Sequence, residues 1–433
     1  MTHLLDKIAS KRARIVVVGI GYVGLPLAVE FARAGFRTTG LDIDADKVIA
    51  LNQGRSYIGD VASEELSPHV LSGRLDATTN ASVLRAADAV VVCVPTPLNK
   101  TKDPDMRFIL AATEEIVEYQ HDDMLIVLES TTYPGTTDEL LIPSLTQAGR
   151  KVGEQLFLAF SPERADPGNP VYKTRNTPKI LAGATPQCLS IAASLYGQII
   201  DELVPVSSTR TAEMVKLLEN TFRAVNIGLV NEIAMMSRRL GVDPFEVIRA
   251  AATKPFGFMP FYPGPGLGGH CIPVDPLLLS WKLRTLHYQA RFIELADSIN
   301  GSMPAYVVER TAQALNDQTK AVRGCKILLY GVAYKRDVSD CRESPAFEII
   351  RNLQDRGARV AYMDPLVPRL ILDDVAMTGV DLATDFGTFD AVVLVTDHST
   401  LDGERMMREA QLVIDTRDAL WRVAGNHAKV YGL

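Results

Sequence analysis

The sequence has no run of about 18 consecutive apolar residues, the length at which an α-helix becomes able to cross a membrane. Its first residues, MTHLLDKIASKRARIVVVG, lack the apolar stretch followed by small residues that marks a signal peptide. The first apolar run leads instead into a glycine turn. We therefore expect a cytoplasmic protein that makes no use of a membrane.

Cysteine is scarce, and its five copies form no CxxC pair and have no histidine at the spacing of a metal site. No bound metal is therefore expected. An odd number of scattered cysteines is typical of a reducing compartment rather than of a disulfide framework. Four of them, Cys93, Cys188, Cys325 and Cys341, read as ordinary small apolar residues.

The chain also lacks an excess of positive charge. A formal net charge of −7 offers no general attraction to nucleic acid or to anionic lipid. A phosphorylated ligand would have to be held locally, by helix N-termini and a few basic side chains. With 433 residues, the chain is too long for a single hydrophobic core, so two or three domains are expected.

Alternating strand-like and helix-like segments fill the first part of the chain. The predicted strands are 14–18, 37–41, 89–94, 124–128, 156–160 and 179–182. Short turns rich in Gly, Pro, Ser and Thr separate them from amphipathic stretches. This alternation predicts a parallel, doubly wound sheet with right-handed crossovers.

The pattern then changes to one long helix, predicted over 209–240 and closed by Gly241. More helix follows a loop rich in Pro and Gly at 254–276, and it extends to about residue 318. A second α/β block begins at Lys326, where KILLYGVAY echoes the earlier RIVVVGIGY. The expected domains are therefore 1–205 (α/β), 206–318 (helical) and 319–433 (α/β).

A dinucleotide-binding turn is predicted at Gly19-Ile-Gly21-Tyr-Val-Gly24, between a strand and a helix. Gly19 permits a tight turn, Gly21 lets a pyrophosphate approach, and Gly24 allows the helix to pack closely on the strand. Asp42 ends the next strand, where its carboxylate can accept hydrogen bonds from a ribose diol and repel a 2′-phosphate. This favours NAD over NADP, although Lys47 nearby weakens the case.

The loop around Cys271 is the strongest local signal. Glycines at 264, 266, 268 and 269 remove side chains just ahead of the cysteine, so backbone amides can wrap a ligand closely. A nucleophilic thiolate benefits from such a setting, whereas a structural cysteine does not. For the adjacent His270, a structural role is favoured over an assisting one.

A polar face interrupts the long helix. Lys216 and Asn220 are four residues apart and share that face, with Glu213 and Arg223 close by. The simple alternative is a solvated surface. Apolar neighbours on the same helix argue against it, because a lysine on a largely buried helix is costly unless it is paired or used.

These motifs together resemble the UDP-glucose/GDP-mannose dehydrogenase family over nearly the whole chain. The matching segments are GIGYVGLP (19–26), CVPTP (93–97), STTYPGTT (130–137), SPERADPG (161–168), EMVKLLENTFRAVNI (213–227), GPGLGGHCIPVDP (264–276) and YKRDVSDCRESP (334–345). The resemblance implies an α/β fold with two Rossmann-like domains joined by a long central helix. It also implies a homodimer formed through that helix.

The resemblance further implies an enzyme that performs two oxidations with two molecules of NAD on a UDP-sugar. Cys271 captures the C6 aldehyde as a thiohemiacetal, and the second oxidation leaves a thioester for water to hydrolyse. Lys216 and Asn220 would orient the C6 oxygen and stabilise its negative charge. Asp275 and Thr131 would position the water, and Glu163 would act as the base.

Two sets of binding residues are carried over on the same motifs. The expected cofactor site comprises Gly19, Gly21, Tyr22, Val23, Gly24, Asp42, Lys47, Pro95, Thr96, Thr131 and Arg342. The expected substrate site comprises Glu163, Arg164, Lys216, Asn220, Gly266, Gly268, Gly269, Tyr334, Lys335 and Arg417. Because the last three belong to the C-terminal domain, that domain is expected to close over the nucleotide.

Departures from the family pattern bear on the sugar. Pro167 stands where the UDP-glucose branch has a second glutamate. SPERxDPGN together with GPGLGGHCIPVDP resembles the branch that oxidises UDP-N-acetylhexosamines, more specifically UDP-N-acetylglucosamine. For the family as a whole, the expected pathway is surface-polysaccharide synthesis. Lys254 lies in a loop where family members often carry an arginine that crosses the dimer interface. UDP-glucose, UDP-N-acetylmannosamine and UDP-N-acetylgalactosamine remain alternative substrates. More distant alternatives are a single-step hydroxyacid dehydrogenase and a non-catalytic NAD-binding protein.

Overall fold

The computed structural model describes residues 2–99, 101–147, 149–164, 166, 168–169, 171–425 and 427–433. The chain divides into two compact units. Unit 1 contains Met1–Glu219 and Trp281–Tyr288, and unit 2 contains Asn220–Ser280 and Gln289–Leu433. The division falls within the long helix α8 (Thr209–Leu240) and within α10 (Asp275–Thr285), so both helices contribute residues to each unit.

An eight-stranded sheet forms the centre of unit 1. In spatial order its strands are β3 (Leu75–Thr78), β2 (Arg37–Leu41), β1 (Arg14–Val18), β4 (Ala89–Val92), β5 (Met124–Leu128), β6 (Leu156–Phe160), β7 (Lys179–Gly183) and β8 (Leu203–Pro205). The first six are parallel and follow the order of a dinucleotide-binding fold.

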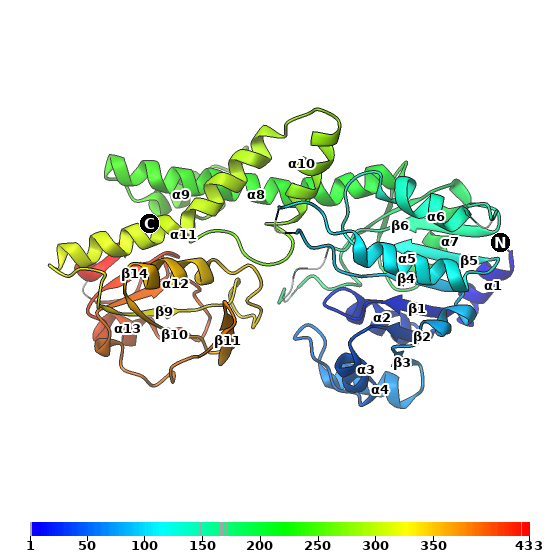
Figure 1. Ribbon diagram of the computed structural model, residues 1–433, viewed down its shortest axis with the longest axis horizontal. Helices are drawn as coiled ribbons and strands as arrows, with labels where there is room; N and C mark the ends of the chain where they lie inside the picture. The colour runs from blue at the N-terminus through cyan, green and yellow to red at the C-terminus, as the bar shows by residue number, and fades with distance from the viewer. Residues whose placement is uncertain are drawn as a thin grey trace. The chain divides into compact units, whose positions relative to one another are not determined.

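Helices cover both faces of this sheet (Figure 1). They are α1 (Thr2–Ala9), α2 (Gly24–Arg33), α3 (Ala45–Asn52), α4 (Ser63–Leu71), α5 (Arg107–Tyr119), α6 (Ile142–Thr146) and α7 (Pro186–Tyr196), with short segments η1 (Ala81–Ala86) and η2 (Thr137–Leu141). Strand β1 shows why two layers form. Ile15 and Val17 pack into the core that α2 and α7 cover, whereas Val16 and Val18 pack into the core that α5 covers.

One expectation for this sheet is corrected. The sequence predicts a wholly parallel sheet, but β7 pairs with β6 in the antiparallel direction, through Phe160 with Ala182 and Ala159 with Gly183. A parallel pair needs a crossover connection, usually a helix. The described residues between β6 and β7 form no helix, so the chain turns back beside β6.

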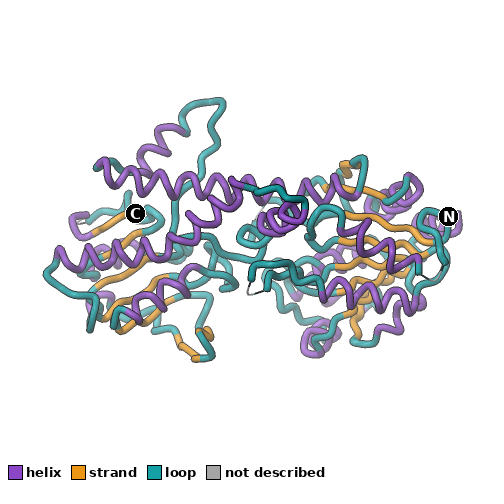
Figure 2. The backbone as a smooth tube through the Cα atoms, turned by 45° about the horizontal axis from the view of Figure 1, so that its top comes forward, coloured by secondary structure: helices purple, strands orange, loops and turns teal. Residues whose placement is uncertain are grey.

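Unit 2 contains a smaller, fully parallel sheet of five strands. In spatial order these are β10 (Arg359–Met363), β9 (Lys326–Tyr330), β13 (Ala391–Leu394), β14 (Val413–Asp415) and β15 (Val430–Gly432). Figure 2 shows the strands of each unit side by side, with helices flanking them. A separate hairpin pairs β11 (Arg369–Leu372) with β12 (Val375–Thr378).

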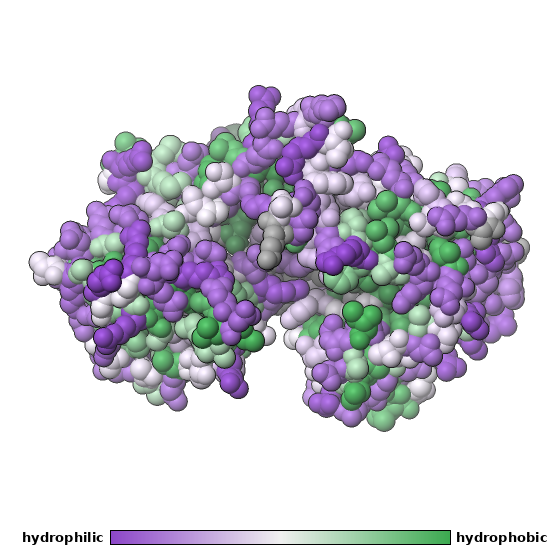
Figure 3. Space-filling model, viewed as in Figure 1, coloured by the Kyte–Doolittle hydropathy of each residue, from purple (hydrophilic) through white to green (hydrophobic). Residues whose placement is uncertain are grey.

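The helices of unit 2 are α9 (Pro244–Ala251), α11 (Arg291–Asp317), α12 (Pro345–Asp355) and α13 (Gly403–Glu409), with short segments η3 (Phe386–Thr388) and η4 (His427–Lys429). Ser344 caps α12 through its side chain, with Pro345 at the first helical position. Helices α11 and α12 pack on one face of the sheet and α13 on the other. On the face drawn in Figure 3, hydrophilic side chains predominate and apolar ones gather in smaller patches.

Candidate active site

The turn after β1 has the geometry of a dinucleotide-binding loop. Gly19 has a φ of +86°, and a Cβ there would lie 2.8 Å from the carbonyl oxygen of Cys93. A Cβ on Gly24 would lie 1.8 Å from the carbonyl oxygen of Gly19, so close packing of α2 requires glycine. At Gly21, no heavy atom of the structure lies within 4 Å of the Cβ position. This glycine therefore has open space beside it, as the approach of a pyrophosphate requires.

Asp42 follows β2 and orders the same turn. Its Oδ2 accepts a hydrogen bond from the backbone N–H of Ile20 at 3.0 Å, and its Oδ1 accepts one from Asp44 at 3.0 Å. Lys47 lies close by, with its Nζ 3.7 Å from Oδ2 of Asp42 and 3.7 Å from Oδ2 of Asp44. Because Lys47 is shared between two carboxylates, the local charge stays negative, which suits a ribose diol better than a 2′-phosphate.

The other cofactor residues expected in unit 1 surround the ends of the neighbouring strands. Tyr22 is exposed at the start of α2, and Val23 is half-buried. After β4, Pro95 is exposed and Thr96 is buried; after β5, Thr131 is half-buried. Parallel strands β1, β4 and β5 present their carboxyl ends at one edge, where ligands of such sheets bind.

Glu163 belongs to a buried ionic cluster at this edge. Lys179 donates hydrogen bonds from Nζ to Oε2 of Glu129 at 2.8 Å and to Oε2 of Glu163 at 3.3 Å. Tyr196 donates its hydroxyl to Oε1 of Glu129 at 2.5 Å. Glu129, Lys179 and Tyr196 lie outside the sequence motifs given above. The sequence contains one signal for two of them, a charged residue beside an apolar run. Glu129 directly follows MLIVL, and Lys179 directly precedes ILA.

Burial and charge act together on the pKa values of this cluster. Burial raises the pKa of Glu129 to about 7, although Lys179 opposes the rise. Burial alone would lower the pKa of Lys179, but the charges of Glu129 and Glu163 raise it above its ordinary value. Burial also raises the pKa of the neighbouring Cys93 thiol, so Cys93 is not a candidate thiolate.

Arg164, an expected substrate residue, is engaged within unit 1. Its Nη1 donates to the carbonyl oxygen of Pro178 at 2.8 Å, and its Nη2 pairs with Glu219 on α8. Ala165 and Pro167, from the same sequence motif, lie outside the described residues.

The polar face of α8 is largely buried. Glu213 accepts hydrogen bonds from the N–H groups of Gly135 and Thr137, so it fixes the STTYPGTT segment rather than contacting solvent. Lys216 and Asn220 are also buried. The alternative of a solvated helix face is therefore wrong for these three residues.

Asn220 connects α8 with the cysteine loop. Its Nδ2 donates to Oδ2 of Asp275 at 2.5 Å, and both side chains are buried. Asp275 is the first residue of α10, and its backbone N–H donates to the carbonyl oxygen of Cys271 at 2.8 Å. Cys271 itself is exposed and takes no part in a disulfide. Within unit 2, the structure thus brings together Cys271, Asn220 and Asp275.

The glycines before Cys271 serve a purpose that the sequence did not reveal. A Cβ on Gly268 would lie 2.6 Å from Cβ of Tyr334, and one on Gly269 would lie 2.8 Å from its ring. Likewise, a Cβ on Gly264 would lie 2.6 Å from Nη1 of Arg417. These glycines let the loop contact Tyr334 and Arg417, two expected substrate residues. Gly266 has a φ of +128°, so it needs glycine for its conformation as well.

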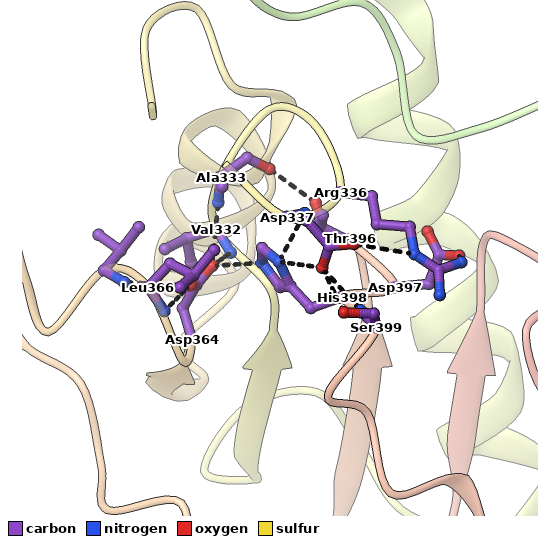
Figure 4. Close-up of polar contacts among 11 residues, drawn as sticks. Val332, Ala333, Arg336, Asp337, Asp364, Leu366, Thr396, Asp397, His398 and Ser399 are labelled. Atoms are coloured by element: carbon purple, nitrogen blue, oxygen red, sulfur yellow. Dashed lines mark hydrogen bonds and ion pairs between the residues drawn. The ribbon is translucent and has the colours of Figure 1, made fainter. Parts of the chain in front are cut away.

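A second turn of the dinucleotide type follows β9 but is closed by internal hydrogen bonds (Figure 4). Asp364, after β10, accepts from the N–H groups of Val332 at 2.7 Å and Ala333 at 3.1 Å. His398 lies with Nε2 3.1 Å from Oδ2 of the same aspartate. Asp364 therefore takes in unit 2 the position that Asp42 takes in unit 1. It is buried, and its carboxylate already accepts hydrogen bonds from within the chain.

His398 also holds the loop that carries Lys335. The backbone N–H of Asp337 donates to Nδ1 of His398 at 3.1 Å, and Asp337 in turn accepts from the N–H of Ser399 at 2.8 Å. In Figure 4, the contacts of Asp337 with His398 and Ser399 join this loop to the segment after β13. Lys335 is half-buried within it. The loop is thus held by Asp337 after Lys335, and by the N–H groups of Val332 and Ala333 before it.

Three further expected residues lie in unit 2. Arg342 is exposed and forms a two-pronged ion pair with Asp340, at 3.0 and 2.6 Å. Its carbonyl oxygen accepts from the N–H of Gly269 at 2.9 Å. Burial lowers the pKa of the adjacent His270, so its imidazole is held neutral. Lys254 is exposed, with its Nζ 5.1 Å from the ring centroid of Phe256.

Two absences hold for the described part of the chain. It contains no cluster of three or more His, Cys, Asp or Glu side chains that could hold a metal ion. It also contains no helix with the length and apolar character needed to cross a membrane.

Three family models match consecutive segments of the sequence. The NAD binding domain of the UDP-glucose/GDP-mannose dehydrogenase family matches residues 13–200, its central domain 210–302, and its UDP binding domain 328–422. The fold and the site therefore define a nucleotide-sugar dehydrogenase. The chain belongs to the UDP-glucose/GDP-mannose dehydrogenase family and is an oxidoreductase that uses NAD.

Individual relatives match over almost the whole chain. UDP-N-acetyl-D-glucosamine 6-dehydrogenase of Pseudomonas aeruginosa is 35% identical over 393 residues, 90% of this chain and 91% of its own. NDP-N-acetyl-D-galactosaminuronic acid dehydrogenase of Ralstonia solanacearum is 35% identical over 422 residues, 94% and 96% of the two chains. The solved structure of UDP-D-ManNAc dehydrogenase from Pyrococcus horikoshii superposes with a TM-score of 0.88 at 31% identity, covering 97% and 98%.

Proposed function

We propose that the chain oxidises the C6 hydroxyl of UDP-N-acetylglucosamine to the carboxylate, with Cys271 as a covalent nucleophile. One observation carries this proposal. Cys271 is exposed, its carbonyl oxygen accepts a hydrogen bond from the N–H of Asp275, and the Asp275 side chain accepts one from Asn220. Hydrogen bonds thus link a nucleophile on the cysteine loop, a carboxylate at the start of α10 and an amide on α8, an arrangement suited to covalent catalysis.

The proposed reaction consists of two oxidations and a hydrolysis, and different residues serve each step. Lys216 and Asn220 orient the C6 oxygen and stabilise its negative charge while the alcohol becomes an aldehyde. The thiolate of Cys271 then attacks the aldehyde carbon, and the C6 oxygen takes up a proton in place of the one that the alcohol lost in the first oxidation, which gives a thiohemiacetal. Its oxidation leaves a thioester on Cys271. Bound NAD accepts a hydride in each of the two oxidations.

Hydrolysis completes the reaction. Asp275 and Thr131 position a water molecule, and Glu163 takes its proton while the water oxygen attacks the thioester carbon. The carbon–sulfur bond breaks, and Cys271 leaves as the thiolate. Covalent attachment between the two oxidations keeps the reactive aldehyde from escaping.

Binding roles follow from the two Rossmann-like sheets. Gly19, Gly21, Gly24 and Asp42 hold NAD, with Tyr22, Val23, Lys47, Pro95, Thr96, Thr131 and Arg342 around it. In unit 2, Tyr334, Lys335 and Arg417 bind the UDP-sugar together with Gly266, Gly268 and Gly269. Lys335 and Arg417 provide positive charge for the diphosphate, which the negative chain as a whole does not.

The choice of UDP-N-acetylglucosamine is supported by the SPERADPGN segment and by two relatives of that printed activity, from Pseudomonas aeruginosa and Salmonella typhi. UDP-N-acetylmannosamine is the second candidate, because relatives named for it match at similar identity. We propose a cytoplasmic location as well, because the proposed nucleotide sugar and NAD are both available there.

We also propose a homodimer formed through α8. Six apolar side chains at helical spacing stay exposed along one face of this helix: Met214, Leu218, Phe222, Leu229, Met236 and Leu240. Their spacings of 4, 7 and 11 residues return to the same side of a helix with 3.6 residues per turn. Such a continuous apolar stripe on a 32-residue helix is suited to pairing with a second copy.

The decisive experiment incubates the purified protein with NAD and each UDP-sugar, and measures product mass and NADH per product. We expect a uronic acid, two NADH per sugar, and the highest kcat/KM with UDP-N-acetylglucosamine. One NADH per product would indicate a single-step dehydrogenase. Cys271→Ser should abolish acid formation and leave NAD binding unchanged, and full acid formation by this variant would exclude the cysteine mechanism.

A further inference from the structure

The reversed strand β7 places a cation, Lys179, at the carboxyl edge of the large sheet. Strands β5 and β6 end at Leu128 and Phe160, so Glu129 and Glu163 follow them at the carboxyl edge of the sheet. Because β7 is antiparallel, its first residue, Lys179, lies at that same edge. Continuing the pairing of Phe160 with Ala182 by three residues sets Lys179 opposite Glu163.

The ammonium group of Lys179 has an acceptor for each of its three N–H donors. Its three hydrogen-bond donors face Oε2 of Glu129 at 2.8 Å, Oε2 of Glu163 at 3.3 Å and the carbonyl oxygen of Pro162 at 3.4 Å. Tyr196 donates to the other oxygen of Glu129. The exposed fractions of the side chains rise in order, 0% for Glu129, 5% for Lys179 and 13% for Glu163. The cluster thus runs from the core toward the surface and ends at Glu163.

A purely structural role would be served by a single ion pair. Two carboxylates around one buried ammonium leave an excess negative charge, which is unfavourable in a buried site. A proton on Glu129 removes that excess, and the pKa of about 7 places its gain and loss near neutrality. The other titratable groups that face Glu129 are Lys179, Glu163, Tyr196 and Cys93.

We propose that Glu129 and Lys179 are positioning residues for Glu163 in the hydrolysis of the thioester. This inference rests on the proposed function. Lys179 donates to Oε2 of Glu163 and the backbone N–H of Arg164 donates to Oε1, so both oxygens are held and the carboxylate has a fixed orientation in which to accept the proton of the attacking water. The water oxygen bonds to the thioester carbon, its proton moves to Glu163, and Cys271 departs as the thiolate. Glu163 then releases the proton to solvent.

The charge on Glu129 controls how strongly Glu163 attracts that proton. When Glu129 is ionised, the positive charge of Lys179 is divided between two carboxylates, and Glu163 is the stronger base. When Glu129 is protonated, Lys179 neutralises Glu163 alone and weakens it. Thioester hydrolysis therefore accelerates as the pH rises through the titration of Glu129.

The test separates hydrolysis from oxidation in a single turnover. NADH absorbance follows the two oxidations, and acid quenching followed by peptide mass analysis measures the acyl group on Cys271. Glu129→Gln is expected to slow hydrolysis about tenfold at pH 8, the effect of one pKa unit on proton transfer. The acyl-enzyme then accumulates, the acceleration near pH 7 disappears, and NADH forms as fast as in the unaltered enzyme.

A second variant keeps the inference testable if Glu129→Gln fails to fold. Tyr196→Phe removes a hydrogen bond that favours ionised Glu129, so the midpoint of the acceleration should move to higher pH. Glu154→Gln provides the matched control, since Glu154 pairs with Lys151 on the surface of the same unit and should change nothing.

The inference would be overturned if Glu129→Gln and Tyr196→Phe both hydrolysed the thioester at the rate, and with the pH profile, of the unaltered enzyme. If Glu163→Gln still accumulated acyl-enzyme, the proposed function would stand and only the roles of Glu129 and Lys179 would fall. Acid formation by Cys271→Ser would overturn both.

Discussion

Nε2 of His398 lies 3.1 Å from Oδ2 of Asp364, and both side chains are buried beneath the loop that carries Lys335 (Figure 4). Because Nδ1 of the same ring accepts a hydrogen bond from the N–H of Asp337, Nε2 is the atom that carries the proton. The His398 ring therefore connects the sheet to the loop through contacts at both of its nitrogens.

Replacing this ring should loosen the loop. His398→Ala removes both contacts and leaves Asp364 without one donor, at an expected cost of about 2 kcal/mol in unfolding free energy. Because Lys335 is then less well placed, KM for the UDP-sugar should rise while KM for NAD stays constant. Steady-state kinetics with each substrate varied in turn measures this. His427→Ala, on an exposed histidine of the same unit, is the control, and equal effects of the two variants would contradict the assignment.

The folded state should lose stability in acid through Asp364. Burial alone would raise its pKa, but hydrogen bonds from His398, Leu366 and Val332 lower it below the ordinary 3.8. A lowered pKa stabilises the folded state fully above pH 3.8, and the contribution disappears as the pH falls through the folded-state value. Urea unfolding across this range should show a steeper loss for the unaltered protein than for Asp364→Asn. Parallel curves would contradict the prediction.

The glycines ahead of Cys271 should tolerate no side chain. Gly269 has a φ of +82°, and its Cβ would overlap the ring of Tyr334, so Gly269→Ala should destabilise unit 2 by about 1–3 kcal/mol. Gly301→Ala is the matched control, because that glycine lies within helix α11 with no heavy atom within 4 Å of its Cβ position. It should stabilise by about 0.5–1 kcal/mol. Thermal unfolding compares the two, and a harmless Gly269→Ala would refute the packing argument.

A charge on the apolar stripe of α8 should dissociate the proposed dimer. Leu229 is half exposed in the single chain, so Leu229→Glu should leave the folded monomer intact. In a dimer, the same change buries unpaired charges at the interface, which is costly. Sedimentation of the unaltered chain should give twice the monomer mass of 47.3 kDa, and the variant should give the monomer mass. A monomeric unaltered chain would exclude the dimer.

Much of the fold could be predicted because its signals are local. Strands β1, β2, β5 and β6 have the predicted bounds, since each is a short apolar run between polar turns, and α8 spans 209–240 as expected from its uninterrupted helical pattern. The shorter β3, β8, β11, β12 and β15 were not predicted, because three or four residues give little periodicity.

The candidate site was only partly accessible from the sequence. Cys271 and Asp275 sit within one continuous motif, and Asp42 directly follows a predicted strand. Lys179 could not be placed, because an apolar run predicts a strand without its direction, and only the antiparallel course of β7 brings this lysine to Glu163. The contacts of Gly268 and Gly269 with Tyr334 were equally hidden, since they join segments more than 60 residues apart in the chain.

The bond from the amide of Asp275 to the carbonyl of Cys271 has a consequence for the timing of the reaction. The bond ties Cys271 to the first residue of α10. The Cys271 sulfur and the Asp275 carboxylate should therefore move together with that helix. In the proposed reaction, this bond should keep the spacing between Cys271, which would carry the acyl group, and Asp275 constant while NADH is exchanged for NAD between the two oxidations.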